Sequence, residues 1–207
     1  MKFSSSLLEN AVNELAKLPG VGKKTALRFV LHLLKQDEIQ SNQLADSIKR
    51  LRSEIQFCSK CFNISDHVLC KVCSSPARKK EQVCVVESIR DVMAIEATEQ
   101  YNGTYHVLGG VISPLDGIVP DMLQIQSLIE RVKIDKVEEL IMALSPTIEG
   151  DTTTYFIAKK LNDTPIKITT LSRGVAFGGE LEYTDELTLA RSFISRLPLE
   201  NVVSTQS

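Results

Sequence analysis

The spacing of four cysteines constrains this chain more than any other feature of its sequence. Two Cys-x-x-Cys pairs are separated by eight residues, in the order Cys58, Cys61, Cys70 and Cys73. Each pair can present two thiolates to one tetrahedral zinc ion, with zinc–sulfur distances of about 2.3 Å. Two disulfides are the alternative arrangement. The spacing predicts one structural zinc per chain, held by all four cysteines.

The surrounding segment, residues 57–80, loses helical periodicity and concentrates Lys and Arg. A zinc ion held by four sulfurs has no open position for a substrate, so we expect the site to fold this segment rather than to catalyse a reaction. His67 lies inside the loop and is the alternative ligand, although we expect it to be exposed. Cys84 stands apart between two valines and is expected in the core.

The amino terminus meets the charges of Lys2 and Glu9 without a long apolar run, so it does not resemble a signal peptide. No stretch approaches the roughly eighteen apolar residues that a membrane span needs. We therefore expect a cytoplasmic protein without a membrane partner. Thiols stay reduced in that compartment, which favours zinc over disulfides.

Charge is divided unevenly along the chain. The net charge is only -2, but residues 1–80 contain 14 Lys and Arg against 7 Asp and Glu, whereas residues 81–207 contain 10 against 19. A basic segment of that size suits a polyanion, and the acidic remainder would repel one unless its carboxylates hold cations or face a protein. Two merely solvated surfaces are the alternative. The asymmetry indicates that the two parts have different partners.

Three helical patterns occupy residues 1–56. Ser6 and Glu9 have the spacing of a capping box, and apolar residues then repeat at helical spacing until Pro19-Gly20. A second pattern follows Gly22, and a third opens at Ser41 with Leu44, Ile48, Leu51 and Ile55 on one face. The chain is therefore expected to begin with a small helical unit.

The turn between the first two helices has the sequence Leu18-Pro19-Gly20-Val21-Gly22-Lys23-Lys24. Its glycines let the backbone approach a bulky ligand, and the free amides that open the next helix favour an anion. The spacing resembles the helix-hairpin-helix motif, which holds a sugar-phosphate backbone without reading bases, while a plain structural turn is the alternative. The candidate DNA-binding residues are Gly20, Gly22, Lys23, Lys24 and Arg28.

From residue 81 onward, apolar runs alternate with helical patterns. We expect strands at 83–86, 105–108, 140–144 and 166–171, and helices at 92–97, 122–132, 153–161 and 187–197. Such alternation is typical of a mostly parallel sheet with flanking helices.

Acidic residues follow two of these predicted strands. Glu87 comes directly after 83–86, and Glu149-Gly150-Asp151 follows 140–144 through a short turn. Ligands gather beyond the carboxyl ends of parallel strands, and one Glu with an acid-x-acid pair could hold magnesium. The arrangement resembles a Toprim domain, the module shared by topoisomerases, primases and some nucleases. Glu149 and Asp151 also suit the first turn of a helix, where negative charge is stabilised.

These modules, in this order, resemble the RecR family along essentially the whole chain, and the segments Tyr105–Gly110, Ile112–Gly117 and Gly178–Arg191 match it further. The resemblance implies a multidomain α and α/β fold. Its expected parts are a helix-hairpin-helix DNA-binding domain at 1–56, a C4-type zinc finger at 57–80, a Toprim domain with a mostly parallel sheet at 81–176, and a C-terminal strand and helix segment for oligomerisation at 177–207. Within the last part, Thr184 is expected to cap the final helix and residues 201–207 to form a loose tail.

The resemblance also implies a non-catalytic recombination mediator in DNA repair. Family members form a ring-shaped tetramer wide enough to encircle duplex DNA, with swapped terminal elements. They act with RecO, and with RecF in some organisms, to load RecA onto gaps coated by single-strand-binding protein. The expected DNA is a junction of single and double strands, bound independently of sequence. Glu87, Glu149 and Asp151 then become candidates for partner contact or weak magnesium binding.

Two other functions stay open at this point. A magnesium-dependent Toprim nuclease or primase-like enzyme would change the length of DNA. A purely protein-binding adaptor would show no salt-dependent association with DNA. For the mediator we expect a cytoplasmic location in association with the nucleoid.

Overall fold

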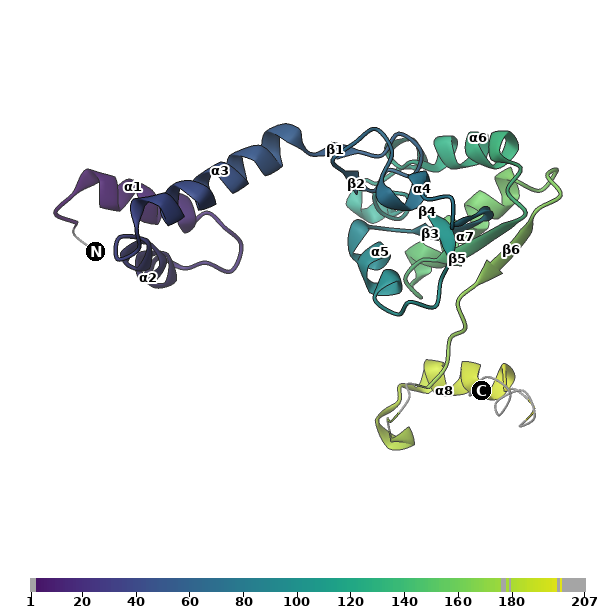
Figure 1. Ribbon diagram of the computed structural model, residues 1–207. Coiled ribbons are helices and arrows are strands. Elements are labelled where there is room, and N and C mark those ends of the chain that lie inside the picture. Colours follow the sequence, from purple (N-terminus) through teal and green to yellow (C-terminus); the bar gives the residue numbers. More distant parts are fainter. Residues whose placement is uncertain (1–2, 176–177, 179, 197, 199–207) are drawn as a thin grey trace. The chain divides into compact units, whose positions relative to one another are not determined.

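The computed structural model describes residues 3–175, 178, 180–196 and 198. The chain divides into two compact units, residues 1–55 and residues 56–207 (Figure 1). None of the helices in the described part of the chain combines the length and the apolar character that a membrane span requires.

The first unit consists of three helices, α1 (Ser6–Leu15), α2 (Lys23–Leu33) and α3 (Glu38–Glu54). Val12 of α1 packs against Ala26 and Val30 of α2, and these three side chains are the buried centre of the unit. The helical N-terminal unit expected from the sequence is confirmed.

The start of α1 lies one residue from its predicted cap. Ser5, and not Ser6, is the N-cap, since its Oγ accepts a hydrogen bond from the backbone N–H of Leu8 at 3.4 Å. Both serines fit the capping preference, so the sequence alone does not distinguish them.

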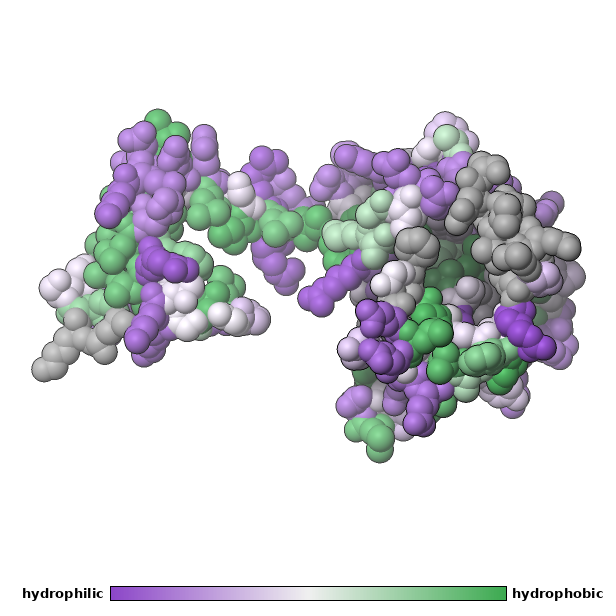
Figure 2. Space-filling view, turned by 90° about the horizontal axis from the view of Figure 1, so that it is seen from below, coloured by the Kyte–Doolittle hydropathy of each residue, from purple (hydrophilic) through white to green (hydrophobic). Residues whose placement is uncertain are grey.

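The third helix differs more. It begins at Glu38, after Asp37 as N-cap, rather than at Ser41, because residues 38–40 extend the helix before its predicted apolar repeat begins. The apolar face predicted for it is on the surface: the exposed fractions of Leu44, Ile48 and Leu51 are 48%, 59% and 62%. Figure 2 shows hydrophobic surface along this helix. The other described residues of the first unit leave this face uncovered.

The second unit is built on a four-stranded parallel sheet with the order β4-β3-β5-β6. The mostly parallel sheet expected from the alternating pattern is confirmed. Its strands are β3 (Lys79–Val86), β4 (Gly103–Val107), β5 (Glu139–Ala143) and β6 (Lys167–Thr170). Its flanking helices are α5 (Ile89–Glu96), α6 (Ile125–Asp135) and α7 (Ile148–Lys160).

Shorter elements precede and follow this sheet. Before it, β1 (Gln56–Phe57) pairs antiparallel with β2 (Ile64–Ser65), and α4 (Lys71–Ser74) follows. Between β4 and α6 lie two single turns of 3-10 helix, η1 (Pro114–Asp116) and η2 (Pro120–Met122). A third, η3 (Leu181–Tyr183), precedes the last helix, α8 (Glu186–Ile194).

The central strand β3 serves two cores, because successive residues of a strand point to opposite faces. Val83 and Val85 pack in a core with side chains of α6 and α7. Cys84 and Val86 pack in a second core with Val92 of α5. Helices therefore cover both faces of the sheet, as Figure 1 also shows.

Several elements of the sheet unit begin earlier than predicted, and β3 and α7 differ most. Strand β3 starts at Lys79 and not at Val83, because its first residues are exposed and charged and give no apolar signal. Helix α7 starts at Ile148 and not at Thr153, because Thr147 caps it: the Oγ1 of Thr147 accepts from the backbone N–H of Gly150 at 3.2 Å. The start of a helix at a polar cap is not visible in the apolar pattern.

The last helix is capped by Asp185 rather than by Thr184. The Oδ1 of Asp185 accepts from the backbone N–H of Thr188 at 2.9 Å. Both residue types favour this position, and the carboxylate is the one placed to accept. Residue 197, where the predicted helix ends, and the expected tail 201–207 lie outside the described residues.

Candidate metal centre and nucleic-acid interface

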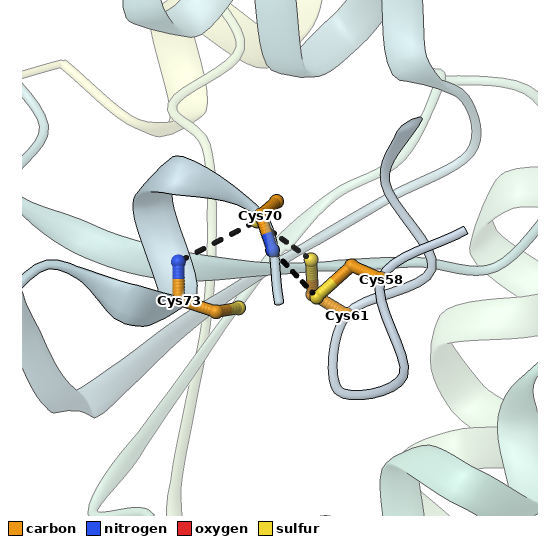
Figure 3. Close-up of side chains that lie close together, drawn as sticks. All are labelled: Cys58, Cys61, Cys70 and Cys73. Atoms are coloured by element: carbon orange, nitrogen blue, oxygen red, sulfur yellow. Dashed lines mark hydrogen bonds between the residues drawn. The ribbon is translucent and has the colours of Figure 1, made fainter. Parts of the chain in front are cut away.

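Four cysteine side chains of the second unit converge on one point (Figure 3). The Sγ atoms of Cys58, Cys61, Cys70 and Cys73 all lie within 4.8 Å of one another, and all four residues are buried and free of disulfide bonds. The Sγ atoms of Cys61 and Cys70 are 3.5 Å apart. That is too long for a disulfide of about 2.05 Å, and close to the edge of about 3.8 Å in a tetrahedron with zinc–sulfur bonds of about 2.3 Å.

Backbone groups support this cluster. The N–H of Cys70 donates to the Sγ of Cys58 at 3.3 Å, and the N–H of Cys73 donates to the Sγ of Cys70 at 3.4 Å. The N–H of Phe62 donates to the carbonyl of Cys58 at 2.9 Å, with a left-handed backbone at Phe62 (φ 61°). Amide donors to sulfur stabilise negative charge there, as the outer shell of a metal site does.

The ionisation of these thiols is interdependent. The pKa of Cys70 is lowered because Cys61 and Cys73 donate hydrogen bonds to its sulfur, and the pKa of Cys61 is raised because it is the donor to Cys70 and is buried. Four thiolates in one buried cluster would repel one another without a cation. A donor set of four sulfurs fits zinc, whereas magnesium and calcium take oxygen ligands.

The cysteine module is joined to the parallel sheet by main-chain and side-chain contacts. The N–H of Val107, at the end of β4, donates to the carbonyl of Cys61 at 2.9 Å. Lys60 Nζ lies 2.8 Å from Asp135 Oδ2, and the Phe62 ring meets His106 edge-on with centroids 5.4 Å apart. These contacts connect the cysteine module directly to β4 and to α6.

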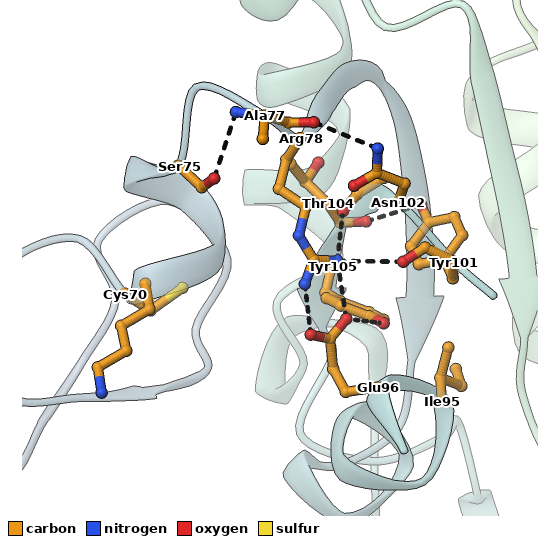
Figure 4. Close-up of polar contacts among 12 residues, drawn as sticks. Cys70, Ser75, Ala77, Arg78, Ile95, Glu96, Tyr101, Asn102, Thr104 and Tyr105 are labelled. Carbon is orange, nitrogen blue, oxygen red and sulfur yellow. Dashed lines mark hydrogen bonds and ion pairs between the residues drawn. The ribbon is translucent and has the colours of Figure 1, made fainter. Parts of the chain in front are cut away.

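A second connection runs through Arg78, where the module leads into β3 (Figure 4). Its guanidinium donates to both carboxylate oxygens of Glu96, at 2.8 and 2.5 Å, and to the carbonyl of Tyr101 at 3.2 Å. Tyr105 Oη also donates to Glu96, at 2.6 Å. The hydrogen bonds from Arg78 hold the pKa of Glu96 below its usual value. This network ties the end of α5 to the start of β3.

The two residues considered beside the cluster lie as expected. His67 is exposed and is not part of the group of converging ligands. Cys84 is 2% exposed in the core next to α5, and burial raises the pKa of its thiol to about 12.

The candidate nucleic-acid interface is the turn between α1 and α2 in the first unit. The backbone N–H of Val21 donates to the carbonyl of Leu18 at 3.0 Å, and Gly20 takes a left-handed conformation (φ 78°) that favours glycine. Gly22 is the N-cap of α2 and has no side chain to accept from the first amides of that helix. Those amides are available to an acceptor from outside the chain.

The space around this turn is open. A Cβ added at Gly20 or at Gly22 would meet nothing within 4 Å. Lys23, Lys24 and Arg28 are exposed beside it. The structure therefore brings together all five residues that the sequence singled out for an anion, at the positive end of a helix dipole.

The three acidic candidates lie on the sheet unit but do not gather into a metal site. The described part of the chain contains one group of three or more potential metal ligands with donor atoms within 4.8 Å of one another, and that group is the four cysteines. Glu87 Oε1 instead accepts from the backbone N–H of Ser145 at 2.5 Å. The expectation of weak magnesium binding by Glu87, Glu149 and Asp151 has no support in this geometry.

Asp151 is paired with arginines from the following segment. Arg173 donates to both of its carboxylate oxygens, at 3.1 and 2.5 Å, and Arg191 Nη2 lies 3.9 Å away. The hydrogen bonds from Arg173 lower the pKa of Asp151. Sequence reasoning missed both pairings. Arg173 belongs to no motif, and the segment that ends at Arg191 carries no signature of a partner, so only the folded chain brings the two arginines to Asp151.

Close packing explains why the residue between the two acidic residues of α7 is a glycine. A Cβ at Gly150 would lie 2.0 Å from the carbonyl oxygen of Ser145. The start of α7 therefore packs directly on the loop that follows β5, and this close approach requires a glycine at position 150.

Family models cover nearly the whole chain. Residues 8–52 match the model "RecR, helix-hairpin-helix", and residues 55–75 match the RecR model of a zinc finger domain with four cysteine ligands. Residues 81–172 match "Toprim domain" and residues 174–196 match "RecR, C-terminal".

The sequences of individual relatives align with this chain over almost their full lengths. The chain is 59% identical to a recombination protein RecR of Cytophaga hutchinsonii, over 97% of this chain and 98% of the relative. It is 56% identical to the RecR of Amoebophilus asiaticus (95% and 98%) and 57% identical to that of Phocaeicola vulgatus (94% and 95%).

Fold, cysteine cluster and helical hairpin together define a recombination protein that joins a helix-hairpin-helix, a four-cysteine zinc finger and a Toprim domain. More narrowly, the chain belongs to the RecR family, and this membership supports a role in DNA recombination and repair. The family resemblance inferred from the sequence is confirmed.

The first prediction concerns the metal. The purified protein should contain about one equivalent of zinc, because four converging thiolates need one divalent cation. Cys58→Ala should lose the metal and unfold residues 57–75, as seen by metal analysis and amide hydrogen exchange. Cys84→Ala is the matched control and should keep the metal, since Cys84 lies in a different core. A wild-type content below half an equivalent would contradict the assignment.

The second prediction concerns Asp151. Because its folded pKa is depressed below its unfolded value, the contact with Arg173 stabilises the fold above the unfolded pKa and is lost as pH falls through the folded pKa. Arg173→Ala should return the pKa of Asp151 toward its ordinary value, measured by NMR titration of the carboxyl carbon. Arg196→Ala removes another exposed arginine of the C-terminal segment, one that donates to the Phe193 carbonyl instead, and should leave that pKa unchanged. An unaltered titration in Arg173→Ala would show that the pair does not persist in solution.

Proposed function

We propose that this protein is a non-catalytic DNA clamp and recombination mediator, which acts with RecO, and with RecF where present, to load RecA at single-strand gaps. The observation that carries the proposal is the open start of α2. Its uncapped amides face outward at Gly22, beside the exposed charges of Lys23, Lys24 and Arg28.

An anion at this turn would meet both partial and full positive charges. The first amides of a helix carry the positive end of its dipole, and an exposed lysine adds a full charge that releases a counterion when a phosphate binds. Neither contact depends on a base edge, so binding is independent of sequence. Gly20, Gly22, Lys23, Lys24 and Arg28 are the proposed DNA contacts, and junctions of single and double strands are the proposed substrate.

The cysteine cluster has a structural role in this proposal. Cys58, Cys61, Cys70 and Cys73 hold one zinc ion with no open coordination position. The metal maintains the short segment that Val107 and Arg78 join to the sheet. We assign the helix-hairpin-helix domain to 1–56, the zinc finger to 57–80, the Toprim domain to 81–176 and an oligomerisation segment to 177–207.

Self-association into a tetramer is supported by uncovered apolar faces. Leu44, Ile48 and Leu51 are exposed on α3, and α8 exposes Leu187 (74%), Phe193 (67%) and Ile194 (81%). Surfaces of this kind usually face another protein. A ring built through both ends of the chain would enclose DNA without reading its sequence, and would work in the cytoplasm at the nucleoid.

The acidic sheet unit is the proposed face for RecO. Glu87 and Asp151 already have internal partners, and the described part of the chain holds no magnesium cluster of carboxylates. We propose that this edge contacts a protein, and the measurement of strand length below tests the alternative of strand cleavage or primer synthesis. Glu149 lies in the first turn of α7, at the carboxyl edge of the sheet, and is the residue proposed to contact RecO.

The third prediction tests the DNA contact. Lys23→Ala combined with Lys24→Ala should weaken binding to single-stranded and duplex oligonucleotides at low salt. The slope of log affinity against log salt should fall by about 0.9 for each lost phosphate contact on duplex DNA. Fluorescence anisotropy over a salt series measures both quantities, with magnesium present so that strand length can be followed in the same samples.

Adjacent lysines elsewhere give the matched control. Lys159→Ala with Lys160→Ala removes the same charge from the exposed end of α7 and should leave the slope unchanged. Unaltered DNA retention in the Lys23 and Lys24 variant would contradict the proposal. A magnesium-dependent change in strand length would favour a Toprim nuclease or primase instead, and no salt-dependent binding at all would favour a protein adaptor.

The fourth prediction tests the partner and the assembly. Light scattering of the eluting protein should give the mass of a tetramer, and a larger complex when RecO and gapped DNA are added. Glu149→Lys should weaken the RecO complex, because it reverses charge at the carboxyl edge of the sheet. Glu138→Lys reverses an exposed charge just before β5, at the opposite edge, and should have no effect. A monomer under all conditions, or equal effects of both variants, would count against this arrangement.

A further inference from the structure

Beyond the hairpin, α2 and the turn after it carry a row of positive side chains along a surface groove. The groove has a volume of about 430 Å³. Its lining consists of basic side chains and two leucines. The residues are Lys24, Leu27, Arg28, Leu31, His32 and Lys35. The hairpin accounts only for the residues at one end of this groove.

The helical repeat places the first of these residues on one face. Lys24, Arg28 and Leu31 are spaced four and three positions apart in α2, so they lie one above another and point away from the buried Ala26 and Val30. Lys35 follows two residues after the helix and lines the same groove. Eleven residues of helix span about 16 Å. Each DNA strand has one phosphate about every 3.4 Å along its axis, so the row is as long as several successive phosphates.

No carboxylate in the described part of the chain neutralises this row. Helix α2 contains no acidic residue. Elsewhere in the first unit two exposed cations are paired, Lys17 with Glu14 at 2.7 Å and Arg50 with Glu54 at 2.9 Å. Within the described residues, Lys24, Arg28 and Lys35 form no such ion pair. Their charge therefore stays available to an external anion.

The apolar part of the groove is compatible with the same ligand. Leu31 lies between the cations, is 44% exposed and is not part of the buried core of the unit. A sugar-phosphate backbone offers apolar sugar carbons between its charges. His32, whose Nε2 lies 3.1 Å from Gln36 Nε2, adds a polar ring nitrogen at the edge.

We infer that the DNA contact surface continues from the hairpin along α2 to Lys35, with Lys24, Arg28 and Lys35 binding phosphates spaced along one strand and Leu31 packing on the sugars. This inference rests on the proposed DNA binding and lengthens its contact. The two ends of the row work differently. Near Lys24 the helix dipole assists the side chains, whereas Lys35 follows the carbonyl end of the helix and contributes through its own charge alone.

The test is a salt series with single-site variants of the full chain. Lys35→Gln should lower the slope of log affinity against log salt by about 0.9 on duplex DNA and by about 0.7 on single strands. Lys35→Arg should restore the wild-type slope, because it keeps the charge. Lys35 is exposed and contributes only a backbone hydrogen bond, to the carbonyl of His32, so both variants should keep the wild-type circular dichroism spectrum.

Lys17→Gln is the matched control, since Lys17 is an exposed lysine of the first unit that Glu14 already neutralises. It should leave the slope unchanged. If Lys35→Gln keeps the wild-type slope while the Lys23 and Lys24 variant loses it, the longer contact is wrong and the hairpin contact stands. If neither variant changes the slope, DNA binding by this unit fails altogether. A changed molecular mass in Lys35→Gln with an unchanged slope would assign the groove to a protein contact and overturn the inference.

Discussion

The convergence of four cysteine sulfurs is the interaction on which the second unit depends. The segment around them has almost no other core, since in the described part of the chain Val72 alone packs against the four cysteines as a hydrophobic neighbour. A metal ion bound by the four thiolates would therefore supply much of the stability of this segment. The sheet in turn depends on that segment. Val107 at the end of β4 bonds to Cys61, and Phe62 and Val72 complete the core that covers one face of β3.

The sequence was sufficient for the features that rest on local spacing. The cysteine pairs, the two glycines of the hairpin and the alternation of apolar runs each depend on neighbours in the chain, and all three led to the correct module and sheet type. Helix starts were less accurate. Ser5, Asp37 and Asp185 cap helices for which other polar residues were equally good candidates on propensity alone.

The acidic site could not be predicted in the same way. That Glu87, Glu149 and Asp151 lie near the ends of parallel strands follows from topology, but whether their oxygens meet depends on loops and on distant residues. Ser145 and Arg173 occupy two of these carboxylates, and neither contact has a sequence signature. Likewise the apolar face of α3 was visible in the sequence, but its exposure is a property of the fold.

The close approach at Gly150 also affects how rigid the acidic edge is. The carbonyl of Ser145 lies against Gly150, while the amide of the same Ser145 is held by Glu87, so one peptide segment fixes the end of β3, the loop after β5 and the first turn of α7 together. A protein that docks on this edge meets a surface that is already ordered. Little conformational entropy is then lost on association, which allows a modest contact area to give useful affinity.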